Sequence, residues 1–153
     1  MNQPMLIFLL HFAATAYMTG VIWLVQLYLY RYLNLIDSAN FGKHHRRYND
    51  IMGLVVGPAM LIELVSCAAL PFLFTEAGRL PAIASIGVLV VIWISTFALQ
   101  VPCHMKLRDR YDAAIHQRLV QSNWIRTAGW TARAVLLIVA AVMEPSALQP
   151  AGM

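Results

Sequence analysis

Charged side chains are scarce in this chain of 153 residues, because Asp, Glu, Lys and Arg together make up only 12% of it. Ordinary globular domains carry about 25%. No such residue occurs from Met1 to Tyr30 or from Leu80 to Cys103, and 60% of the whole chain is hydrophobic. This composition excludes an ordinary soluble domain and predicts an integral membrane protein in contact with the lipid bilayer.

Several chemical motifs are also missing. The only cysteines, Cys67 and Cys103, are not paired as CxxC, and the sequence contains neither H-E-x-x-H nor C-x-x-C-H. The usual sequence signatures of structural zinc sites, zinc proteases and c-type haem attachment are therefore absent. A nucleic-acid partner is not expected either, since no soluble basic face with stacking aromatic residues is present.

Four apolar runs remain, each long enough to cross about 30 Å of hydrocarbon, which takes about 20 helical residues. The first run lacks the basic start and short apolar core of a cleaved signal peptide, so it is kept as a helix. The sequence thus predicts an all-α fold, an integral membrane four-helix bundle that forms a single transmembrane domain over residues 1–153. The expected spans are residues 4–30, 51–75, 80–104 and 123–143.

The cations indicate an orientation. Nine of the eleven Lys and Arg residues fall in two segments, Arg31 to Asp50 and Lys106 to Arg126. Short loops rich in Lys and Arg stay on the cytoplasmic side of a membrane. We therefore predict a multi-pass protein of the cell membrane with both basic loops in the cytoplasm and both termini outside.

The two halves of the chain follow the same order of span, basic loop and span. Gln26 followed by Arg31 is echoed by Gln100 followed by Lys106. This pattern raises the hypothesis of two parallel helix-pair repeats, an arrangement that in membrane proteins often places a binding site between the halves.

Polar residues inside the spans align along one side of each predicted helix at 100° per residue. An ionisable group near the centre of a bilayer costs at least about 2.5–3.5 kcal/mol unless it is paired or hydrated, so these stripes predict a shared polar interior open to the cytoplasm. The stripes are His11, Thr15, Thr19, Trp23, Gln26 and Tyr30; Met52, Val56, Met60, Glu63 and Cys67; Trp93, Thr96, Gln100 and His104; and Asn123, Arg126, Trp130 and Arg133.

Three residues of this interior are the candidate catalytic groups. Glu63 is the candidate proton acceptor or ligand-orienting carboxylate, and Arg133 its counter-ion or an anion anchor, since both lie about 15 Å deep. His104 is the candidate general base. The alternative is that Glu63 and Arg133 form a purely structural ion pair.

Further residues are candidate ligand contacts. Gln26, Gln100 and Asn123 are expected to donate hydrogen bonds to a polar ligand, although such amides can instead join helices to one another. Arg126 is the expected anion contact, and Trp130 lies beside it on the same stripe.

The histidines form the candidate metal site, because imidazole suits Zn, Cu, Fe and Ni, and haem needs only one axial histidine. The candidate ligands of a transition metal or haem are His45, His104 and His116, with His44 next to them. The alternative is that the adjacent pair His44 and His45 is simply a solvated part of a basic loop.

Five stretches of the sequence support a resemblance: Trp23–Gln26, Phe41–His45, Val56–Glu63, Ser95–His104 and Asn123–Arg133. They resemble an uncharacterised family of small bacterial membrane proteins with four spans. In length and helix number the chain is also distantly similar to anthrone-oxygenase-like membrane proteins, some fungal members of which oxidise polyketide anthrones. That second resemblance implies an oxidoreductase and assigns no residue.

Three hypotheses of function follow. The first is a cofactor-dependent or metal-dependent oxidoreductase that acts on a small membrane-soluble ligand. The second is a proton-coupled carrier in which Glu63 relays protons. The third is a membrane assembly subunit without chemistry of its own, and an oligomer is compatible with all three.

Overall fold

The protein folds into four long helices, three of which contain a short change in helical type, whereas the fourth is continuous. The computed structural model describes residues 3–33, 35–75 and 77–148, and within them it contains no strand. The predicted all-α four-helix bundle is therefore confirmed. In chain order the elements are α1 (Gln3–Leu24), η1 (Val25–Leu29), α2 (Tyr30–Leu33), α3 (Ser38–Ser66), η2 (Cys67–Ala69), α4 (Leu70–Leu73), α5 (Arg79–Ser95), η3 (Thr96–Gln100), α6 (Val101–Leu107), α7 (Ala113–Met143) and η4 (Pro145–Leu148).

All four helices are long and apolar enough to cross a membrane, with helical lengths of 29 to 34 residues. They extend past the expected spans, since α3 begins at Ser38 and α7 at Ala113, whereas the apolar runs begin near residues 51 and 123. Much of the two segments expected as basic loops is thus helix. The physical reason is that an apolar run marks where a helix enters hydrocarbon, whereas backbone hydrogen bonding continues beyond it into the polar region.

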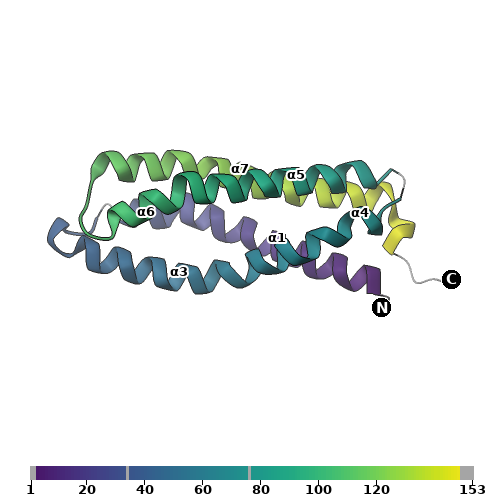
Figure 1. The fold of residues 1–153 in the computed structure, drawn as a ribbon, viewed down its shortest axis with the longest axis horizontal. Helices are drawn as coiled ribbons and strands as arrows, with labels where there is room; N and C mark the ends of the chain where they lie inside the picture. The colour runs from purple at the N-terminus through teal and green to yellow at the C-terminus, as the bar shows by residue number, and fades with distance from the viewer. Residues whose placement is uncertain (1–2, 34, 76, 149–153) are drawn as a thin grey trace.

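The helices form an elongated bundle in which the start of α1 and the end of α7 lie at one end (Figure 1). Helix α1 is central, because it packs against both α3 and α7, and α7 packs along α5. The connections from α2 to α3 and from α6 to α7 lie together at the opposite end. We call this the basic end, because most Lys and Arg residues surround it.

Close contacts fix the basic end. Asp112 begins α7 by accepting a hydrogen bond from the Ile115 backbone N at 3.0 Å. A Cβ atom on Gly42 would lie 2.9 Å from the carbonyl oxygens of both Arg108 and Asp109, so α3 passes directly against the turn after α6. Arg46 adds a hydrogen bond to the Arg108 carbonyl at 2.8 Å.

Two helices contain a π-helical segment at comparable positions. Segment η1 interrupts the first helix and carries Gln26, and η3 interrupts the third helix and ends at Gln100. Pro102 follows η3, and a proline inside a helix removes one hydrogen bond and displaces the preceding turn. Both glutamines are buried. A π turn in a helix is often found at a functional site, and these two lie close to the cavity described next.

Candidate functional site

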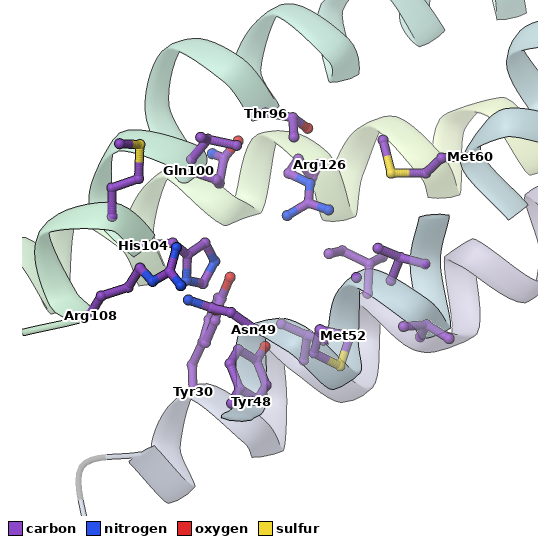
Figure 2. Close-up of a pocket in the computed structure, with 17 residues that line it drawn as sticks. Tyr30, Tyr48, Asn49, Met52, Met60, Thr96, Gln100, His104, Arg108 and Arg126 are labelled. Carbon is purple, nitrogen blue, oxygen red and sulfur yellow. The ribbon is translucent and has the colours of Figure 1, made fainter. Parts of the chain in front are cut away.

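A cavity of about 290 Å³ lies inside the basic half of the bundle, between α3 on one side and η3 and α6 on the other (Figure 2). Helix α7 contributes Arg126, and the first helix contributes apolar side chains and Tyr30. The polar lining residues are Tyr30, Tyr48, Asn49, Thr96, Gln100, His104, Arg108 and Arg126. Apolar residues, among them Val25, Met52, Val56 and Met60, complete the wall.

Two arginines line the cavity, and Arg126 is the buried one, whereas Arg108 is exposed. Figure 2 shows the guanidinium of Arg126 directed into the space that faces Tyr48 and Met52 on α3. The residue is only 8% exposed. Its Nη1 donates a hydrogen bond to Asn123 Oδ1 at 3.2 Å, and its Cζ atom lies 5.2 Å from the ring centroid of Trp130. Its Nε atom is buried without a hydrogen-bond partner among the described residues.

Gln100 presents a second free donor to the cavity. Its Oε1 accepts a hydrogen bond from Ser95 Oγ at 3.1 Å, which fixes the orientation of the amide. Its Nε2 is buried and has no partner in the described part of the chain. A buried donor without a partner costs about 1–3 kcal/mol. Two such donors at one cavity therefore indicate that a ligand or a water molecule accepts their hydrogen bonds.

Aromatic and imidazole groups close the basic end of the cavity. His104 Nδ1 and His45 Nε2 lie 3.3 Å apart and share a hydrogen bond. The Tyr30 ring lies 6.3 Å from the His104 ring and 6.4 Å from the His116 ring, centroid to centroid. His45 is fully buried, whereas His44 is exposed. Of this adjacent pair, only His44 is therefore a solvated residue.

These histidines do not assemble a complete metal site. Within residues 3–33, 35–75 and 77–148, no group of three or more His, Cys, Asp or Glu side chains is close enough to hold a metal ion. His45 and His104 are in contact, whereas His116 lies edge-on to the Tyr30 ring and lines a separate cavity with Tyr111. Structural and catalytic zinc sites use at least three protein ligands, so this arrangement does not fit a resident zinc ion.

Gln26 and Asn123 bond to each other instead of facing the cavity. Asn123 Nδ2 donates to Gln26 Oε1 at 2.8 Å, and Gln26 Nε2 donates to the Val120 carbonyl at 3.2 Å. Asn123 then holds Arg126 through its own Oδ1. These two amides join the first helix to α7 and position the arginine. Of the predicted ligand contacts, Gln100 and Arg126 line the cavity, whereas Gln26, Asn123 and Trp130 do not.

Glu63 and Arg133 form a buried ion pair, in agreement with their predicted equal depth. Both are 0% exposed. Glu63 also accepts hydrogen bonds from Thr15 Oγ1 at 2.7 Å and from Trp130 Nε1 at 2.9 Å. Both carboxylate oxygens of Glu63 therefore accept hydrogen bonds from protein groups. The pair lies deeper in the bundle than the cavity, whose wall on α3 extends only to Met60.

The guanidinium of Arg133 is satisfied in the same way. Its Nε donates to the Ser85 carbonyl at 3.2 Å, and its Nη2 donates to His11 Nε2 at 2.9 Å. Since Nε2 of His11 accepts this bond, the neutral ring carries its proton on Nδ1. That nitrogen lies 2.7 Å from Ser66 Oγ and donates a hydrogen bond to it. All four long helices thus contribute to one closed polar network at the middle of the bundle.

Sequence reasoning placed Gln100, His104 and Arg126 in one interior, and the structure brings them to one cavity. It did not single out Tyr48 and Asn49, which line the cavity from α3, because they precede the apolar run and belong to the segment expected as a loop. The signal that could have found them is spacing: Tyr48, Met52 and Val56 recur every four residues and share one helical face.

No family model, curated protein or solved structure matches this chain. The geometry of the cavity and the buried groups around it are therefore the basis for assigning a function.

Proposed function

We propose that this integral membrane protein binds a small membrane-soluble ligand in the cavity at the basic end. One observation carries the proposal: Arg126 and Gln100 line the cavity, and each has a buried donor atom without a partner in the described residues. Buried polar groups in folded proteins are nearly always hydrogen-bonded, and we assign the missing acceptors at this cavity to a bound molecule. The ligand therefore carries acceptor oxygens at one end.

The basic end faces the cytoplasm in this proposal. The support is the concentration of Lys and Arg at that end of the bundle, together with the position of the start of α1 and the end of α7 at the other end (Figure 1). Short cation-rich connections are retained in the cytoplasm. The cavity would then be reached from the inner side of the membrane.

Proton transfer at the bound ligand is the chemistry that the lining side chains support. His104, Tyr30 and Tyr48 surround the end of the cavity where acceptor oxygens would lie (Figure 2). Imidazole and phenol groups can transfer protons to or from an oxygen-bearing head group, and a redox step on the ligand would also require a separate electron acceptor or donor, such as a quinone. At about 290 Å³ the cavity is at the small end of ligand sites, which span about 300–1,000 Å³, and this argues against an enclosed haem.

The geometry favours a structural role for Glu63 over the proton relay that a carrier would require. Three donors occupy the carboxylate, and water does not reach it in the described structure. A relay group needs a path to water or to the transported ligand. We therefore place the working site at Arg126, Gln100 and His104, and assign Glu63 and Arg133 to holding the helices together.

Ligand-induced thermal stabilisation of the purified protein tests the proposal. The probes are decylubiquinone, palmitate, hexadecylphosphate, haem and Zn²⁺, with an optical spectrum recorded before any addition. We expect at least one of the first three to stabilise the parent, by about 2.7 kcal/mol at a hundredfold excess over Kd. Gln100→Leu should weaken that effect. A parent stabilised by none of the first three probes would contradict the proposal, whether or not haem or Zn²⁺ stabilises it.

A further inference from the structure

Two arginines on α7 are buried, and only one has a carboxylate partner. Arg133 pairs with Glu63. Arg126 lies seven residues earlier, about 10 Å toward the basic end, and within the described residues it forms no ion pair. Its contacts are the neutral side chains of Asn123 and Trp130. A buried charge without a counter-ion is strongly unfavourable in a membrane protein. An anion from outside the chain should therefore pair with the guanidinium of Arg126.

The cavity has a polar end and an apolar opening. Gly53 and Met105 are exposed parts of its wall, as is Val101 at 36%, and they lie on α3 and α6 within membrane-spanning helices. In a bilayer, these exposed apolar positions contact lipid. The cavity therefore opens sideways between α3 and α6, toward the hydrocarbon of the leaflet at the basic end.

The volume limits what can be enclosed. A cavity of about 290 Å³ is at or below the lower limit of sites that bury a whole drug-sized ligand, about 300 Å³. A head group and its first carbons fit such a space, whereas a long hydrocarbon chain does not. Any tail has to leave through the opening beside Gly53 and Val101, where the surroundings are apolar.

We propose that the ligand is an amphiphile with a small anionic oxygen head, a carboxylate or a phosphate, and a hydrocarbon tail. Its head binds Arg126 and Gln100, and its tail passes between α3 and α6 into the leaflet at the basic end. This inference rests on the proposed ligand site and adds the charge of the ligand and its route of entry. Free acids, alkyl phosphates and phospholipid head groups share this chemistry.

Binding of matched charged and neutral probes tests the charge. Palmitate, hexadecylphosphate, hexadecanol, methyl palmitate and phosphatidic acid are titrated at pH 8 into the full-length protein in nanodiscs of neutral lipid. A charge-assisted contact to Arg126 should make palmitate or hexadecylphosphate bind about tenfold or more tightly than hexadecanol. Stronger binding of phosphatidic acid than of either single-chain probe would identify a phospholipid head as the source of the anion.

Two variants connect this preference to the arginine. Arg126→Gln should reduce the difference between palmitate and hexadecanol to within about twofold, and Arg126→Lys should keep part of it. The parent alone decides the main question, even where a variant fails to fold. Equal binding of acid and alcohol by the parent overturns the anionic inference and leaves the ligand site standing, whereas no binding of any probe overturns both.

Photocrosslinking tests the route. Palmitate with a diazirine in the middle of its chain is bound to the parent, illuminated, and its attachment sites are mapped by peptide mass spectrometry. We expect attachment on α3 near Gly53 and on α6 between Val101 and Met105, suppressed by excess unlabelled palmitate. Attachment spread evenly over all four helices, or unaffected by competitor, would overturn the lateral opening.

Discussion

The indole Nε1 of Trp130 donates a hydrogen bond to Glu63 Oε2 at 2.9 Å, deep in the bundle and fully buried. The same indole lies beside Arg126, whose Cζ atom is 5.2 Å from the ring centroid. Trp130 therefore joins the closed network around Glu63 to the wall of the cavity. Its indole N–H donates to the ion pair, and its ring packs against Arg126.

Replacing Trp130 with Phe should separate these two roles. Trp130→Phe keeps an aromatic ring near Arg126 and removes the donor to Glu63, so it should cost about 1.5–3 kcal/mol of unfolding free energy. Thermal or denaturant unfolding of the purified protein measures this. Trp124→Phe is the control, because Trp124 is exposed and should change stability by less than about 0.5 kcal/mol. Equal effects of the two variants would contradict the assignment.

Glu63 and Arg133 should behave as one unit. Glu63→Gln and Arg133→Gln each leave a buried charge without its partner, and each should cost about 3–5 kcal/mol. The double variant should cost clearly less than the sum of the two, as measured in a double-mutant cycle. Simple additivity would show that the two side chains do not interact.

The exposed pair Arg46 and Asp109 provides a comparison for that cycle. Their side chains are 48% and 89% exposed, and the closest atoms are 3.9 Å apart. Exposed pairs contribute about 0–1 kcal/mol, so Asp109→Asn should have little effect on unfolding. If Asp109→Asn lowered the free energy of unfolding as much as Glu63→Gln does, burial would not determine the strength of these pairs.

The sequence predicted the parts of this fold that depend on hydrophobicity and helical period. The long apolar runs predicted four helices, and the depths of Glu63 and Arg133 predicted partners that the structure shows in contact. The stripe on the first helix placed His11 and Thr15 on the inner face, where both are buried. These features follow from the spacing of residues along a single helix.

Features that depend on contacts between helices were not predicted. Whether an amide faces a ligand or another helix depends on its neighbours, so the sequence could not separate Gln100 from Gln26, which bonds to Asn123. The π segments η1 and η3 were also not anticipated, because hydropathy does not record a change in hydrogen-bond register. Tyr48 was overlooked because the helix continues beyond its apolar part.

Labelling of introduced cysteines tests the orientation. In a variant without Cys67 and Cys103, Asp109→Cys should be protected from a membrane-impermeant thiol reagent in intact cells, and Ala77→Cys should react. The reason is that Asp109 lies at the cation-rich end and Ala77 in the connection at the other end. Permeabilised cells should label at both positions. The opposite pattern in intact cells would place the basic end outside.

Gly42 should be intolerant of any side chain. A Cβ atom there would lie 2.9 Å from two backbone carbonyl oxygens, and backbone cannot move aside as a flexible side chain can. Gly42→Ala should therefore lower stability by about 1–3 kcal/mol in thermal unfolding. Gly20→Ala is the matched control, because no heavy atom lies within 4 Å of its added Cβ. Equal stability of the two variants would show that α3 does not pass closely over the turn at Arg108.

The central claim is that the cavity beside Arg126 is a ligand site, and obstructing its opening tests that claim most directly. Gly53 is an exposed part of the cavity wall and has no heavy atom within 4 Å of an added Cβ, so Gly53→Leu should narrow the opening without a backbone clash. Gly87→Leu is the control, since its Cβ also meets nothing within 4 Å and Gly87 is not part of the cavity wall.

The measurement is the shift in unfolding temperature that palmitate, hexadecylphosphate and decylubiquinone cause in the parent and in both variants. We predict that Gly87→Leu retains any shift seen in the parent, whereas the apparent affinity of Gly53→Leu for the same probe is at least about tenfold lower. Without ligand, both variants should unfold at the same temperature as the parent. A parent that shows no shift, or a Gly53→Leu variant that keeps the full shift, would contradict the account.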